Sequence, residues 1–158
     1  MQEVAAQYPG LSLTLFDLPE VISSAQTRLE SLDLGARIAL SRGSFRDDAL
    51  PVGCDAISLV RVLYDHDDAS VRALLAKVHA ALPPDGRLII AEPMAGGARP
   101  APEGDVYFAF YTMAMGTGRA RSPERIAEMC REAGFQDVKF PFAPRPYVAS
   151  AVCCVKSA

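Results

Sequence analysis

The chain has 158 residues, of which 50% are hydrophobic and 22% are charged, a composition typical of one globular domain with a sizeable core. The formal net charge is −3 and the basic residues are scattered, which argues against a nucleic-acid partner because phosphate backbones require clustered Lys and Arg. The N-terminus lacks a signal peptide, and the longest apolar stretch outside the strands, 106–115, is too short for a membrane span. We therefore expect a cytoplasmic protein without a transmembrane segment. Two histidines and four cysteines without a C-x-x-C pair predict no metal site.

Short apolar runs that favour strands alternate with helical patterns along the chain. The predicted strands are Leu11–Phe16, Arg37–Ser41, Cys54–Leu63 and Arg87–Ala91. One helix is expected to begin at Pro19, with Val21, Leu29 and Leu32 on its apolar face. A second helix follows the acidic run 65–68 and ends before the prolines 83–84.

The last third of the sequence predicts a helix and then a hairpin. Ser122 as N-cap, Pro123 in the first turn and Gly134 after the end delimit the helix. Asp137–Phe142 and Tyr147–Val155 are rich in strand-forming residues, and the short Pro-rich segment between them leaves no room for a helix, so they should pair antiparallel. The predicted fold is α/β: a mostly parallel sheet, covered by helices on both faces, that ends in a C-terminal antiparallel hairpin.

The region 96–117 departs from this alternation. Its first part is a Gly- and Pro-rich loop, and its second part, VYFAFYTMAM, is rich in aromatic residues and methionine. Two interpretations stay open for the second part: a buried helix packed on the sheet, or the lining of a pocket for an apolar ligand.

Polar residues stand where four predicted strands end: Asp17, Ser44, the run 64–67 and Glu92. Ligands of open α/β sheets bind at this edge. A carboxylate such as that of Asp17 can accept hydrogen bonds from both hydroxyls of a ribose, although an aspartate before a helix is more often a helix cap. No glycine-rich phosphate-binding loop occurs, and only ten residues precede the first predicted strand, so we expect 1–158 to be the C-terminal part of one domain whose first strand and glycine-rich loop are missing.

Four segments in order carry a family resemblance: LTLFDLPEVI, GSFRDDALPVGCDAISLVRVLYDHDD, GRLIIAEP and GTGRARSPERIAEMCREAGF. They resemble the small-molecule O-methyltransferases related to caffeate and hydroxyindole methyltransferases. Within that family, LVRVLYDHDD is most similar to the bacterial carotenoid O-methyltransferases of the hydroxyneurosporene and demethylspheroidene type, with bacteriochlorophyll-pathway C-methyltransferases also close. The resemblance implies a Rossmann-like enzyme that transfers a methyl group from S-adenosylmethionine to the hydroxyl of an apolar small molecule, a carotenoid.

The resemblance also implies roles for individual residues. The cofactor-binding candidates are Asp17, Leu18, Gly43, Ser44, Phe45 and Arg61, with Asp17 matching the aspartate that binds the ribose. The catalytic candidates are Tyr64, Asp65, His66 and Glu92. Tyr64 stands where plant members have a catalytic histidine, Glu92 matches a glutamate that flanks it, Ala120 replaces a second glutamate, and Ser44 replaces an aspartate beside the adenine.

The role of Tyr64 has two interpretations. A free tyrosine has a pKa near 10 and is a poor base, so its hydroxyl would orient the acceptor or relay a proton with help from Asp65 or His66. Alternatively, the ring only fills space at the strand end. His66 competes for the role of base but also suits helix capping, and His79 is expected to be packed within a helix.

Two other functions are compatible with parts of the sequence. A nicotinamide dehydrogenase would also explain Asp17, but it should show a lysine four residues after its tyrosine, where this chain has Asp68. A truncated, non-catalytic fragment is a further alternative. We expect a homodimer, because an open apolar sheet edge favours self-association.

Overall fold

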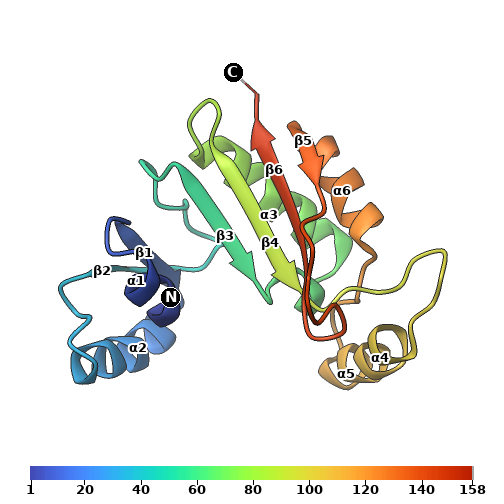
Figure 1. Cartoon of the computed structure of the whole chain (residues 1–158), viewed down its shortest axis with the longest axis horizontal. Helices are drawn as coiled ribbons and strands as arrows, with labels where there is room; N and C mark the ends of the chain where they lie inside the picture. The colour runs from blue at the N-terminus through green and yellow to red at the C-terminus, as the bar shows by residue number, and fades with distance from the viewer. Residues whose placement is uncertain (158) are drawn as a thin grey trace. The chain divides into compact units, whose positions relative to one another are not determined.

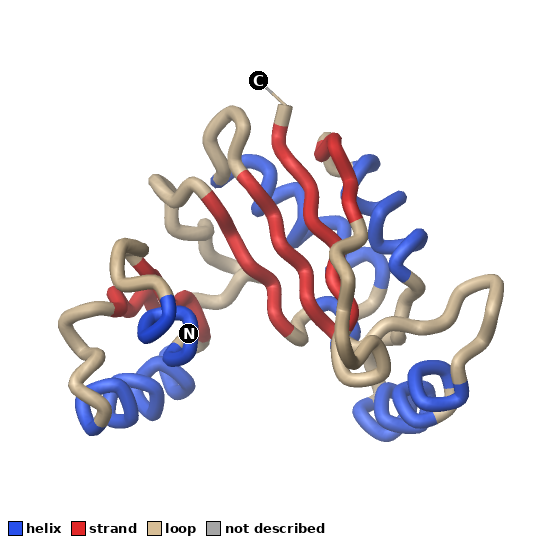
Figure 2. The backbone as a smooth tube through the Cα atoms, viewed as in Figure 1, coloured by secondary structure: helices blue, strands red, loops and turns tan. Residues whose placement is uncertain are grey.

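The computed structural model describes residues 1–157, which form two compact units, Met1–Pro51 and Val52 onward. Figures 1 and 2 show the course of the chain. Each unit alternates strands with helices, as the sequence predicts. No helix within residues 1–157 has the length and apolarity needed to cross a bilayer.

The first unit contains a two-stranded parallel sheet. Its elements are α1 (Gln2–Gln7), β1 (Leu13–Asp17), α2 (Pro19–Ser31) and β2 (Ile38–Arg42). Strand β1 pairs with β2 from Leu13 opposite Ile38 to Asp17 opposite Arg42, so the carboxyl ends of both strands lie together. Leucines of both strands pack against a small core of Ala5, Leu29 and Ile38.

The second unit contains a four-stranded mixed sheet in the order β3-β4-β6-β5. Its elements are β3 (Ala56–Val60), the 3₁₀ turn η1 (Leu63–Asp65), α3 (Asp68–Ala81), β4 (Arg87–Glu92), α4 (Pro102–Asp105), α5 (Tyr107–Met115), α6 (Pro123–Glu132), β5 (Phe135–Lys139) and β6 (Ser150–Lys156). Strands β3 and β4 are parallel, and β6 runs antiparallel to both β4 and β5. The predicted α/β class and C-terminal antiparallel hairpin are confirmed.

Helices α3 and α6 lie on the same face of this sheet (Figure 1). Leu88 and Ile90 of β4 point toward them and are completely buried, whereas Ile89 of the same strand and Val60 of β3 remain 38% and 59% exposed. Right-handed crossovers that move in one direction along a sheet place their helices on one face. Within residues 52–157, α3 and α6 thus cover one face of the four-stranded sheet, and the expected helices on both faces of a sheet that includes β1 and β2 stay a prediction.

The hairpin strands differ in position from their predicted runs. Strand β5 begins at Phe135 and ends at Lys139, and its pairing with β6 shifts between Gln136 and Lys139. Asp137 has a positive φ of 48° at this irregularity. The following segment 140–149 contains three prolines, which lack the N–H that a strand pairing needs, so it forms a loop.

Candidate functional site

The turn after β3 and the end of β4 bring together the predicted catalytic residues of the second unit. Strand β3 ends at Val60, and the chain turns through Arg61, whose φ is 57°, into η1 with Tyr64 and Asp65. Parallel neighbours end at the same sheet edge, so Glu92 at the end of β4 lies beside this turn. The backbone N–H of Leu63 donates to Glu92 Oε2 at 2.8 Å.

Tyr64 is almost completely buried, with 3% of its surface exposed. Arg61 Nη2 donates to the Tyr64 hydroxyl at 3.3 Å, and its guanidinium carbon lies 5.4 Å from the ring centroid. Helix α5 supplies Phe108 and Tyr111, whose ring centroids lie 5.8 and 5.7 Å from that of Tyr64. The interaction with the neighbouring Tyr64 hydroxyl raises the pKa of Tyr111. Packing and polar contacts together therefore fix the Tyr64 hydroxyl.

Two carboxyl groups, those of Asp65 and Glu92, belong to the same strand ends as this tyrosine. Glu92 is completely buried, and burial raises its pKa to about 7, although hydrogen bonds from the Leu63 and Tyr64 backbones and the charge of Arg121 oppose this rise. Burial also raises the pKa of Asp65, against the attraction of His66 and Arg61. Glu92 Oε1 and Asp65 Oδ1 are buried without a hydrogen-bond partner among the residues of the structure. Such orphaned oxygens are unusual in a fold, and carboxyl groups with a raised pKa cluster at functional sites, so Glu92 and Asp65 are candidates for the site.

The first unit holds five of the six cofactor-binding candidates. Asp17 ends β1, and its Oδ1 accepts the N–H of the next residue, Leu18, at 2.8 Å. Leu18 is the N-cap of α2 and the helix start has no side-chain cap hydrogen bond, so Asp17 does not have the helix-cap role. Gly43 donates its N–H to the Asp17 carbonyl at 3.0 Å, and a Cβ at this glycine would lie 2.7 Å from the Phe16 ring. A side chain at this position would therefore have to displace the Phe16 ring.

Ser44 and Phe45 follow in a tight turn. The Ser44 N–H donates to Asp48 Oδ2 at 2.8 Å, and its hydroxyl accepts the N–H of Arg46 at 3.2 Å. The guanidinium of Arg46 lies 5.7 Å from the Phe45 ring centroid. The carboxylate and hydroxyl groups of this edge suit the ribose and adenosine parts of a nucleoside cofactor. The sixth candidate, Arg61, lies in the second unit against Tyr64 instead.

The two histidines differ in setting. His66 follows η1, and its carbonyl accepts a hydrogen bond from Arg121 at 2.8 Å. Asp67, rather than an earlier aspartate of the run, is the N-cap of α3, because its side chain accepts the Ser70 N–H. His79 lies on α3 with its ring centroid 5.1 Å from that of Phe135, which confirms the expected packed histidine.

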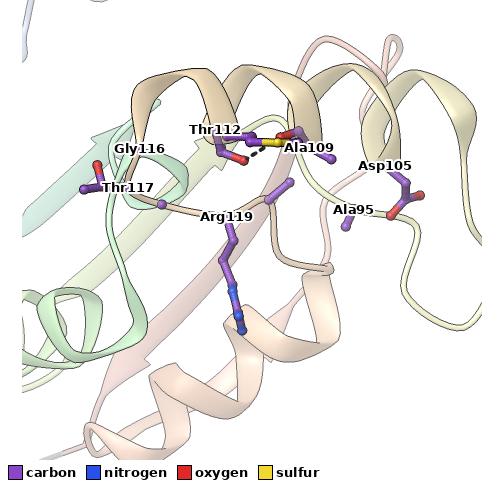
Figure 3. Close-up of a pocket in the computed structure, with 10 residues that line it drawn as sticks. Ala95, Asp105, Ala109, Thr112, Gly116, Thr117 and Arg119 are labelled. Atoms are coloured by element: carbon purple, nitrogen blue, oxygen red, sulfur yellow. Dashed lines mark hydrogen bonds between the residues drawn. The ribbon is translucent and has the colours of Figure 1, made fainter.

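Helix α5 lines two cavities of the second unit. One, of about 450 Å³, is bounded by small and polar residues around the 116–120 loop (Figure 3): Ala95, Asp105, Ala109, Thr112, Met113, Gly116, Thr117, Gly118, Arg119 and Ala120. The other, of about 570 Å³, is lined by Pro102, Val106, Tyr107, Phe110 and Tyr111. Phe108 and Thr112 are buried, whereas Tyr107, Phe110 and Met113 are about two-thirds exposed. The pocket-lining interpretation of this segment therefore fits, and the fully buried helix does not.

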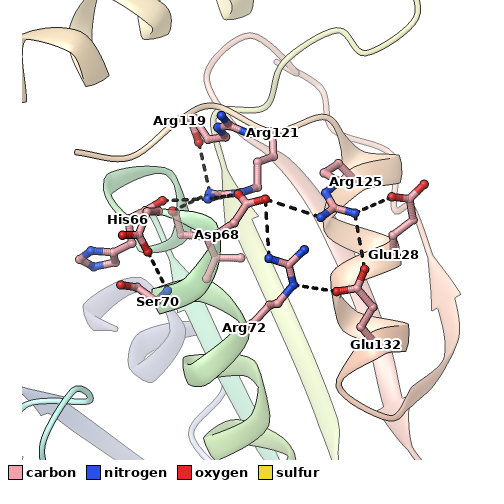
Figure 4. A network of polar contacts seen from close by, with 11 residues as sticks. His66, Asp68, Ser70, Arg72, Arg119, Arg121, Arg125, Glu128 and Glu132 are labelled. Carbon is pink, nitrogen blue, oxygen red and sulfur yellow. Dashed lines mark hydrogen bonds and ion pairs between the residues drawn. The ribbon is translucent and has the colours of Figure 1, made fainter. Parts of the chain in front are cut away.

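Sequence reasoning missed two residues of the site. Tyr111 lies within the segment interpreted as a pocket lining, but its pairing with Tyr64 has no sequence signal. Arg121 precedes the predicted N-cap of α6, and the sequence pattern does not predict that it is buried. It is only 2% exposed and donates hydrogen bonds to the turn that carries Tyr64 (Figure 4). Hydrophobic periodicity identifies buried apolar residues, so it gives no signal for a single buried arginine.

Comparisons with known proteins agree on one family. A family model described as an O-methyltransferase domain matches residues 1–136. Demethylspheroidene O-methyltransferase of Rhodobacter capsulatus is 57% identical over 96% of this chain, and that of Cereibacter sphaeroides is 54% identical over 97%. The chain spans 37% and 40% of the length of these relatives. The crystal structure of human N-acetylserotonin methyltransferase in complex with SAM superposes with a TM-score of 0.87 and 26% identity, over 99% of this chain and 44% of that one.

Proposed function

Because this chain belongs to the family of O-methyltransferase domains, we propose that the protein carrying it transfers a methyl group from S-adenosylmethionine to the hydroxyl of an apolar small molecule. The Rossmann-like fold and the family predicted from the sequence motifs are confirmed. Family membership also excludes the dehydrogenase alternative.

The observation that carries the proposal is the Tyr64–Tyr111 hydroxyl pair, because Tyr111 also lines the α5 cavity with Val106, Tyr107 and Phe110. A groove with apolar walls, one of whose lining residues packs against Tyr64, suits a long apolar molecule that ends in an alcohol. Two relatives above 50% identity are demethylspheroidene O-methyltransferases. We therefore propose a hydroxylated carotenoid as the acceptor.

The reaction is a displacement in which the acceptor oxygen bonds to the methyl carbon as the carbon–sulfur bond breaks. The cofactor supplies an electrophilic methyl group on a positively charged sulfur. The protein must align the acceptor hydroxyl and remove its proton. Tyr64 orients that hydroxyl, since its own hydroxyl is fixed by Arg61 and Tyr111. The proton is relayed from this hydroxyl toward the carboxyl groups of Asp65 and Glu92.

Asp17 is the proposed ribose ligand, with Gly43 and Ser44 beside it. Asp17→Ala should weaken binding of S-adenosylhomocysteine about tenfold to a hundredfold, the range expected for losing hydrogen bonds to a charged group. Titration calorimetry on the intact protein measures this change. Glu20→Ala, an exposed carboxylate in the first turn of α2, is the matched control and should leave affinity unchanged. Unaltered affinity in Asp17→Ala would remove Asp17 from the cofactor site.

The activity test supplies the intact protein with S-adenosylmethionine carrying a ¹³C-labelled methyl group and with demethylspheroidene. We expect a product whose new carbon has the NMR shift of a methoxy group. A methyl group on carbon would instead support the C-methyltransferase alternative, and no product from this or any hydroxylated polyene would contradict the proposal.

Phe110→Ser should raise KM for the polyene without changing KM for the cofactor, because this side chain lines only the apolar cavity.

A further inference from the structure

Arg121 connects segments of the second unit that lie more than fifty residues apart. Its Nη1 donates to the Leu63 carbonyl at 2.9 Å, and its Nη2 donates to the His66 carbonyl at 2.8 Å. Nε and Nη2 also bond to Asp68 Oδ1 at 2.9 and 2.8 Å (Figure 4). One guanidinium therefore holds both ends of the turn that carries Tyr64.

The backbone around Arg121 holds the same turn from a second direction. The Thr117 hydroxyl donates to the Asp65 carbonyl at 3.1 Å. Gly118 has a φ of 87°, and a Cβ there would collide with the Tyr64 carbonyl. The Arg121 carbonyl accepts the N–H of Ala95, just beyond Glu92, at 2.9 Å. The segment 117–121 is thus bound to both strand ends that form the candidate site.

We propose that Arg121 is a positioning residue for methyl transfer: its guanidinium fixes the turn 63–68 against Glu92, and thereby places the Tyr64 hydroxyl and the Asp65 carboxyl. This inference rests on the proposed function. Lysine cannot replace it, because four acceptors, the carbonyls of Leu63, His66 and Arg119 and the Asp68 carboxylate, need the planar fork of a guanidinium, whereas an ammonium group is a single point charge. Arg121 contacts the backbone of the turn and the Asp68 carboxylate, and not the reacting atoms.

Two matched substitutions test this role in the intact protein. Arg121→Lys keeps the charge and should lower kcat about a hundredfold, with each KM within about twofold, because a small displacement of an aligning group has this cost. Arg125→Lys is the control: Arg125 belongs to the same ionic network, but its guanidinium bonds to the carboxylates of Asp68, Glu128 and Glu132. The kcat of Arg125→Lys should therefore equal that of the wild type. Full kcat in Arg121→Lys, or an equal loss in Arg125→Lys, overturns the proposal.

A second measurement does not depend on activity. The Leu63 amide donates to Glu92, so its ¹H–¹⁵N signal in NMR should titrate with a midpoint near pH 7 as this carboxyl ionises. Arg121→Lys should abolish or strongly reduce that titration, whereas Arg125→Lys should retain it. If the Leu63 amide signal of Arg121→Lys titrates as it does in the wild type, the proposal is refuted, even if the acceptor has been misassigned. Failed methyl transfer by the wild type, with the titration as expected, contradicts only the proposed function.

Should Arg121→Lys fail to fold, Asp68→Asn provides the same information. This change leaves the three carbonyl contacts of Arg121 but removes the carboxylate that orients its guanidinium. We expect a loss in kcat of about tenfold and a weakened Leu63 titration. Unchanged kcat together with an unchanged titration would contradict the proposal.

Discussion

Tyr64→Phe in the intact protein is expected to lower kcat for methyl transfer about a hundredfold while cofactor affinity stays unchanged. The substitution removes only the hydroxyl that Arg61 and Tyr111 hold in place. The phenylalanine ring keeps the packing against Phe108, so a large loss of stability is not expected. Steady-state kinetics together with calorimetric binding of S-adenosylhomocysteine separates the two effects.

Tyr111→Phe is the matched control for this substitution. It removes the partner hydroxyl from the same pair, but the Arg61 contact to Tyr64 remains, so the loss in kcat should be smaller. Asp17→Ala should show the opposite pattern, with weaker cofactor binding and little effect on kcat at saturation. A folded Tyr64→Phe protein with full activity would show that the ring only fills space and would shift the role of base to His66.

The helices of the second unit were predictable because their ends carry local signals. The Ser122 hydroxyl accepts the N–H of Arg125 at 3.3 Å, Pro123 opens α6, and Gly134 follows its end with a φ of 99°. Such caps depend on residues within one turn and can be read from sequence. In α2, by contrast, the expected buried residue Val21 is 42% exposed, and its neighbour Ile22 is completely buried. Where two adjacent residues of a helix are both apolar, the sequence pattern does not decide which of them faces the core.

The candidate site was only partly predictable, because its contacts join distant segments. The polar residues at the end of β1 in the first unit, and at the ends of β3 and β4 in the second, were found from the rule that ligands bind at the carboxyl ends of strands. The contacts that hold Tyr64 come from Tyr111 on α5 and Arg121 before α6, and neither stands in a local pattern. Whether Asp17, Tyr64 and Glu92 act as assigned stays a prediction, as does the homodimer.

Glu92 should make the protein less stable as the pH rises toward neutrality. Its pKa is raised from 4.5 to about 7 in the folded protein, so the folded state binds the proton more tightly than the unfolded chain. The resulting stabilisation is fully present below about pH 4.5 and is lost as the pH rises through about 7; it amounts to about 3 kcal/mol. The groups that face this carboxyl are Arg121, which favours its ionised form, and Asp65, which disfavours it.

Glu92→Gln is therefore expected to stabilise the fold at pH 8 by up to about 3 kcal/mol and to leave it nearly unchanged at pH 4.5, since glutamine resembles the protonated acid. The amide oxygen can still accept the Leu63 N–H that Glu92 Oε2 accepts now. Urea unfolding of wild type and variant at both pH values gives the difference. Glu132→Gln on the surface of α6 is the control with the opposite sign: Arg72 lowers the pKa of that carboxyl, so its replacement should destabilise the fold at pH 8. A Glu92→Gln protein that is less stable than wild type by the same amount at both pH values would show that Glu92 is ionised throughout and that the turn requires its charge.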